Sequence, residues 1–90
     1  MRLLWSDNSL ADLQRVRTFL EPKSRRAAAQ AIDNIREGIR KLLVHPKLGE
    51  QLDDYPTETR RLFVADYEVR YQPMPDAIYV VRIFHMREER

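Results

Sequence analysis

The chain has 90 residues, of which 43% are hydrophobic and 33% charged, a composition typical of one globular domain spanning residues 1–90. It contains no cysteine and two histidines, His45 and His85, which excludes a disulfide framework and a thiol or zinc site, so we expect no metal or cofactor. The net charge of +2 argues only weakly for nucleic acid or an acidic partner. The first ten residues resemble neither a signal peptide nor a membrane span, and we expect a cytoplasmic protein.

A short strand and a helix are predicted first. Residues 2–5 have the apolar character of a strand, and Ser6 or Asp7 can accept a hydrogen bond from the free amides that begin a helix. That helix must stop near Glu21, because Pro22 disfavours helical geometry in the residue before it. The helix would bury a stripe with spacings of three, three and four, formed by Leu10, Leu13, Val16 and Leu20.

A second helix follows almost at once. Ser24 is its cap, and the pair His45-Pro46 ends it. Because so few residues join the helices, we expect an antiparallel hairpin in which Ala31 and Gly38 let the backbones approach closely. The buried stripe of this helix consists of Ala28, Ile32, Ile35, Ile39 and Leu42.

The second half of the chain has the period of strands. Apolar residues alternate over residues 62–64 and 67–71, QPMPDA supplies a turn, and AIYVVRIF is a nearly continuous apolar run. We therefore predict an α+β fold, in which an N-terminal strand and the helical hairpin precede a mostly antiparallel sheet of three strands. Tyr67, Val69 and Tyr71 should face the helices, with Glu68 and Arg70 on the other face.

Basic residues gather on or beside these strands. They predict either a groove that binds phosphate or carboxylate groups, which a guanidinium fits with its fixed fork of donors, or a solvated sheet face. No motif in the chain fixes a reaction by itself. The residues concerned are Arg60, Arg61, Arg70, Arg82, Arg87 and Arg90, with Tyr71 and His85 beside them.

Two of these residues have sharper interpretations. Arg82 lies inside the most apolar strand, where it requires a paired carboxylate, with Glu68 as a candidate, or the anion of a partner. His85 could exchange protons, since the ordinary histidine pKa lies near 6.5, or it could be a hydrogen-bonded structural residue at a strand end.

In this order, several of these features resemble the RelE/ParE superfamily of bacterial toxins from toxin–antitoxin pairs, over nearly the whole chain. The markers are Trp5 with Asp12 and Leu13, the loop HPKLG at residues 45–49, Arg60 or Arg61, the YxVxY strand at residues 67–71, and a closing strand with Arg82, His85 and Arg87.

The resemblance implies one fold but two activities. Members similar to RelE cleave messenger RNA on the ribosome, whereas members similar to ParE inhibit DNA gyrase without being nucleases. The nuclease pattern is incomplete here, because Glu68 stands where the nucleases have an arginine, only Arg61 matches one of their two lysines, and the chain ends at Arg90 before their last tyrosine.

We therefore predict a toxin similar to ParE that binds and inhibits DNA gyrase and is covered by an antitoxin whose tail folds on binding. The alternatives are a ribosome-dependent RNase, for which His85, Arg87 and Arg61 would be catalytic, and a non-toxic relic that only binds antitoxin. In the binding hypothesis the target or the antitoxin would contact Arg60, Arg61, Arg70, Arg82, Arg87 and Arg90.

Overall fold

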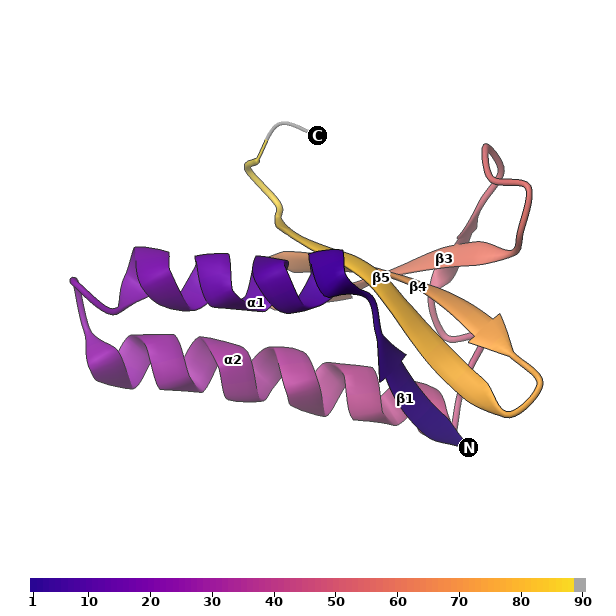
Figure 1. Ribbon diagram of the computed structural model, residues 1–90, viewed down its shortest axis with the longest axis horizontal. Helices are drawn as coiled ribbons and strands as arrows, with labels where there is room; N and C mark the ends of the chain where they lie inside the picture. The colour runs from indigo at the N-terminus through magenta and orange to yellow at the C-terminus, as the bar shows by residue number, and fades with distance from the viewer. Residues whose placement is uncertain (89–90) are drawn as a thin grey trace.

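The computed structural model describes residues 1–88 and contains a helical hairpin packed on a five-stranded sheet (Figure 1). The predicted α+β fold is confirmed. In chain order the elements are β1 (Arg2–Trp5), α1 (Asp7–Leu20), α2 (Arg25–Arg40), the 3-10 turn η1 (Lys41–Leu43), β2 (Glu50–Leu52), β3 (Thr59–Val64), β4 (Tyr67–Met74) and β5 (Ala77–His85).

Both helices begin where their serine caps predict. Ser6 Oγ accepts from the amide of Ser9 at 2.9 Å, and Ser24 Oγ accepts from the amide of Ala27 at 3.1 Å. The prediction that Leu10 belongs to the buried stripe is wrong, because this side chain is 50% exposed. It lies in the first turn of α1 and lines a hollow beside β1 instead of entering the core.

The strand order is β1-β5-β4-β3-β2, with β1 parallel to β5 and all other neighbours antiparallel. The sequence did not predict β2, whose three residues include exposed Glu50 and Gln51 and therefore carry no apolar alternation. The predicted turn at QPMPDA is shorter than expected. β4 continues through Pro73 because this residue lies beyond the part of β4 that pairs with β3, where a proline removes no bond to that neighbour.

The core lies between the hairpin and one face of the sheet. The predicted stripe of α2 is buried, and Val69 and Tyr71 of β4 face it as expected. Gly38, however, does not serve the contact between the two helices. A Cβ atom at this position would lie 2.6 Å from Val64 Cγ2, so the glycine lets α2 approach β3.

A β-bulge in β5 decides which way Arg82 points. Val80 pairs with Tyr71 and Arg82 pairs with Arg70, so Val81 is an extra residue without a partner in β4. Without this bulge, strict alternation would place Arg82 on the same face as buried Ile78 and Val80. The extra residue therefore turns the arginine away from the core and returns Ile83 to it.

No helix among residues 1–88 has the length and apolar character needed to cross a membrane.

Candidate binding surfaces

The basic residues of the last third divide between two surfaces. Three arginines lie in register on the sheet face away from the helices: Arg61 pairs with Arg70, and Arg70 pairs with Arg82. We call Arg61, Arg70 and Arg82 the arginine row. Its aromatic neighbours are Phe63 and Phe84, and guanidinium groups lie 4.6 to 5.4 Å from the centres of their rings.

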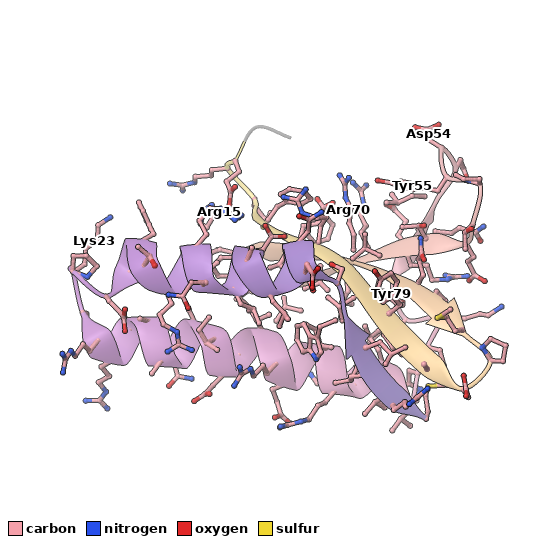
Figure 2. The ribbon with its side chains drawn as sticks, viewed as in Figure 1. Arg15, Lys23, Asp54, Tyr55, Arg70 and Tyr79 are labelled. Atoms are coloured by element: carbon pink, nitrogen blue, oxygen red, sulfur yellow. The ribbon has the colours of Figure 1, made fainter. Side chains whose placement is uncertain are left out.

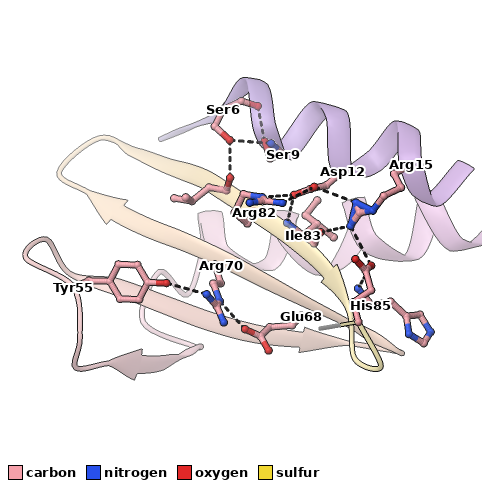
Figure 3. Close-up of polar contacts among 12 residues, drawn as sticks. Ser6, Ser9, Asp12, Arg15, Tyr55, Glu68, Arg70, Arg82, Ile83 and His85 are labelled. Carbon is pink, nitrogen blue, oxygen red and sulfur yellow. Dashed lines mark hydrogen bonds and ion pairs between the residues drawn. The ribbon is translucent and has the colours of Figure 1, made fainter. Parts of the chain in front are cut away.

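Like charges on neighbouring strands repel, and each arginine of the row is offset by a carboxylate. Arg61 Nη2 lies 2.6 Å from Glu50, and Arg70 Nε lies 2.7 Å from buried Glu68 (Figure 3). Arg70 also donates to the hydroxyl of Tyr55, which reaches over the sheet from the loop after β2. The row is therefore a set of ion pairs, which favours the interpretation of a solvated sheet face over that of a phosphate groove.

Arg82 is paired as expected, but the predicted partner Glu68 is wrong. Its guanidinium donates to both oxygens of Asp12, at 2.9 and 3.2 Å, and this hydrogen bonding raises the pKa of Arg82 (Figure 3). The register explains the error, since Glu68 lies opposite Phe84 and bonds to Arg70. Asp12 is reached because α1 crosses the edge of β5 beyond the end of β1.

Asp12 also completes the edge of β5. Its carboxylate accepts from the backbone amide of Ile83 at 2.8 Å and from Arg15 Nη1 at 3.1 Å, and its side chain is only 5% exposed. Ser6 Oγ donates to the carbonyl of Val81 at 2.7 Å. Beyond the end of β1, the side chains of Ser6 and Asp12 thus bond to backbone groups of β5 that would otherwise lie at an unpaired strand edge.

Arg60 lies on the other face and has a different environment from the row. Its Nη1 donates to the carbonyl of Gly49 at 2.7 Å, and its Nε pairs with Glu58, whose pKa this hydrogen bond lowers. Tyr71 holds the same loop, donating to Pro46 O and accepting from the Gly49 amide, both at 2.8 Å. Arg60 therefore fixes the HPKLG loop and does not join Arg61, Arg70 and Arg82.

His85 lies in a groove beside α1. The groove has a volume of about 590 Å³, and the His85 ring packs edge-on against Tyr67 with centroids 5.3 Å apart. We call this surface the His85 groove. It is lined by Arg15, Val16, Phe19, Lys23, Tyr67, His85, Arg87 and Glu88.

One nitrogen of His85 is already used inside the protein. Nδ1 accepts a hydrogen bond from the backbone amide of Arg87 at 3.1 Å, and a backbone amide can only donate. The lone pair of Nδ1 is thus committed, and a neutral ring carries its proton on Nε2. In this form the ring can donate a hydrogen bond from Nε2 to a group bound in the groove.

The His85 groove combines apolar surface with excess positive charge. Phe19 is 64% exposed, and the Lys23 ammonium lies 4.0 Å from its ring centre. Glu88 is the one acidic residue of the lining and pairs with Arg15 at 3.1 Å, leaving the charges of Lys23 and Arg87 without a carboxylate in the lining. An apolar segment with carboxylates at its flanks matches this surface.

The structure therefore separates residues that the sequence grouped together. Arg61 lies across the sheet from the groove that holds His85 and Arg87, and Arg90 lies outside the described residues. Arg15, Phe19 and Lys23 also line the groove, although no motif in the sequence marks them. Arg15 and Phe19 are four residues apart on α1, off its apolar stripe, and this spacing was the available signal for them, whereas Lys23 lies in the turn after the helix. Among the described residues, no three histidine or carboxylate side chains gather as ligands of a metal.

Comparisons with known proteins agree on a family. Residues 3–90 match the model of the ParE toxin of type II toxin–antitoxin system, parDE. The protein named Toxin RelE3 from Caulobacter vibrioides is 34% identical over 80 residues, covering 88% of this chain and 87% of that protein.

Two solved structures share the fold. The chromosomal ParDE system from P. aeruginosa gives a TM-score of 0.77 at 20% identity, covering 94% of this chain and 95% of that one. The RelB-RelE antitoxin-toxin complex from Methanococcus jannaschii gives 0.54 at 17% identity, with 93% and 91% covered.

Proposed function

Since the chain belongs to the ParE toxins of type II toxin–antitoxin systems, within the RelE/ParE superfamily, we propose that it arrests growth by binding DNA gyrase in the cytoplasm. In this proposal the toxin inhibits the enzyme without breaking a covalent bond itself, and a cognate antitoxin neutralises it.

The observation that carries the proposal is the hydrogen bond from the Arg87 amide to His85 Nδ1. Cleavage of RNA requires a base that removes the proton of the 2′-hydroxyl and cations that stabilise the developing charge. Cations line the groove, but His85 has its Nδ1 lone pair occupied, and the Glu88 carboxylate is paired with Arg15. Inhibition of gyrase by binding does not require His85 to remove a proton.

The proposed antitoxin fits the His85 groove. A disordered tail that folds on binding would bury an apolar side chain against Phe19, Val16 and Tyr67 and place carboxylates near Lys23 and Arg87. Both solved neighbours come from toxin–antitoxin systems, which supports a partner of this kind.

One observation favours a second candidate function. The relative at 34% identity is named Toxin RelE3, and the superfamily resemblance associates RelE with cleavage of messenger RNA. In that case His85 and Arg87 would act within the groove, aided by Arg15 or Lys23 in place of the distant Arg61. The third alternative, a relic that binds antitoxin only, predicts no growth arrest at all.

Induced expression tests the proposal. Plasmid supercoiling and cleavage of ribosome-bound messages are measured in the same culture after induction. Relaxed plasmids with intact messages support inhibition of gyrase. Cut messages with normal supercoiling support the nuclease, and normal growth supports the relic.

A further inference from the structure

We propose that the outer edge of β1 is a second antitoxin site, where an extended acidic segment pairs as a sixth strand of the sheet. The inference rests on the proposed function, because it requires an antitoxin. It concerns a surface at the opposite end of β5 from the His85 groove.

The backbone of β1 has one edge without a partner. The amides of Arg2 and Ser6 donate to Asp76 and Val80 at the edge shared with β5. Because amides alternate along a strand, the amide and carbonyl groups of Leu3 and Trp5 point to the other edge. Within residues 1–88 no hydrogen bond satisfies them there. Such an edge is a template for strand addition.

A hollow of about 280 Å³ borders this edge. Its apolar lining comes from Leu3 and Trp5 of β1 together with Leu10 and Leu13 of α1, and Leu10 is 50% exposed. Alternate side chains of an added strand would cover this apolar surface. The exposure of Leu10, which is anomalous for a residue in an apolar helix stripe, is then explained by the partner.

The charges around the hollow indicate which partner fits. Arg36 and Arg40 of α2 complete the lining, and Arg2 is exposed on β1 itself. Glu37 pairs with Arg40, which leaves Arg2 and Arg36 without a carboxylate among the described residues. A second copy of this chain would bring like charges together, whereas an acidic segment would offset them. The charge pattern therefore favours the antitoxin over self-association.

Amide hydrogen exchange tests the proposal directly. The rates of Leu3 and Trp5 are measured by NMR in the free toxin and in its complex with the co-expressed antitoxin. We expect both amides to exchange at least about tenfold more slowly in the complex, while Leu4, already bonded to β5, changes little. A complex that leaves Leu3 and Trp5 unprotected overturns the second site and spares the proposed function. Failure to form any complex contradicts both.

Two variant pairs sharpen the test. Leu3→Pro removes one outward amide and Leu3→Ala keeps it, so the proline variant should bind antitoxin about 2- to 10-fold more weakly than the alanine variant. Arg36→Glu should weaken binding about 3- to 10-fold at low salt, whereas Arg26→Glu, an exposed control on the same helix, should not. Equal affinities within both pairs would refute the site. Protection of Leu3 and Trp5 that rises with toxin concentration in the absence of antitoxin would instead indicate self-association.

Discussion

Asp12 is the residue on which the edge of β5 depends most. It has three donors, Arg82, Arg15 and the Ile83 amide, and it is almost fully buried. Arg82, by contrast, retains access to water, with 39% of its side chain exposed. The two members of this ion pair should therefore respond differently to substitution.

We predict that Arg82→Met changes the free energy of unfolding by no more than about 1 to 2 kcal/mol, because Asp12 keeps its other two donors. Asp12→Ala should cost about 3 kcal/mol or more, since it leaves the buried Ile83 amide without an acceptor and two arginines without their carboxylate. Urea denaturation of both variants measures the difference. A loss above about 4 kcal/mol for Arg82→Met would show that Asp12 depends on Arg82 alone.

His85 distinguishes binding from cleavage. We predict that His85→Gln leaves growth arrest nearly intact, because glutamine keeps a polar side chain of similar reach. Arg87→Glu should weaken the arrest by reversing a charge in the groove. Loss of general acid–base catalysis would instead remove a factor of about 100 to 10,000 in rate. A folded His85→Gln protein that permits growth, beside a wild type that cuts messages, contradicts the binding mechanism.

At the scale of elements, the contact between α2 and β3 depends on Gly38. A Cβ atom here would lie 2.6 and 2.7 Å from the two γ carbons of Val64, a β-branched residue that cannot easily rotate away. We predict that Gly38→Ala destabilises the protein by about 1 to 2 kcal/mol, although alanine is intrinsically better in a helix by about 1 kcal/mol.

A double-mutant cycle provides the control for Gly38. In a Val64→Ala background the obstructing methyl groups are absent, and the helix preference of alanine should then dominate. Gly38→Ala should become neutral or stabilising by up to about 1 kcal/mol in thermal or urea unfolding. A cost that is the same in both backgrounds would mean that Val64 is not the obstacle.

The sequence predicted those helices and strands that have a local signal, but not the features that depend on how strands pair in the folded protein. Serine caps and apolar stripes located both helices, and alternation located β3 and β4. The polar strand β2 forms because it pairs with β3, and no local pattern in residues 50–52 predicts that pairing. The partner of Arg82 was missed because the bulge at Val81 and the crossing of α1 over β5 depend on the assembled fold.

For the candidate site, the sequence predicted the types of residue involved, but it did not predict which of them lie together. The sequence grouped the arginines with His85 because all of them lie on or beside strands. A strand has two faces, and the register places Arg61 and Arg70 on one and Arg60 on the other. Two of the ion pairs that offset the arginine row, Arg61 with Glu50 and Arg82 with Asp12, join residues 11 and 70 positions apart and appear only in the folded protein.

In the whole molecule, the helices cover one face of the sheet, and the His85 groove has two basic residues, Lys23 and Arg87, that pair with no carboxylate of its lining. Figure 2 shows Arg15 on α1 and Lys23 at the turn after it, with Tyr55 and Arg70 toward the other end of the molecule, over the sheet. The His85 groove and the arginine row are thus separate surfaces of the toxin.

We predict that antitoxin stabilises the toxin through the His85 groove. Free antitoxin at a concentration of 100 times its Kd adds about 2.7 kcal/mol to the free energy of unfolding of the toxin. In a domain of this size, this should raise the Tm by about 10 °C or more. Phe19→Ser should raise the Kd for antitoxin by at least about tenfold, since it removes the exposed aromatic ring of the groove. The antitoxin should then stabilise this variant less than it stabilises the wild type.

Phe63→Ser is the matched control, because Phe63 is also an exposed phenylalanine, 51% accessible, but lies on the other face of the sheet beside the arginine row. It should leave the affinity for antitoxin nearly unchanged. If Phe63→Ser weakens binding and Phe19→Ser does not, the antitoxin covers the opposite face.

Inhibition of gyrase is measured most directly with purified components. Toxin is titrated into a supercoiling reaction that contains purified DNA gyrase, ATP and relaxed plasmid, and antitoxin is then added. If the toxin inhibits gyrase by binding, supercoiling falls in proportion to the toxin bound, His85→Gln inhibits as well as the wild type, and antitoxin restores activity. Undisturbed supercoiling at toxin concentrations that cut ribosome-bound message would contradict it.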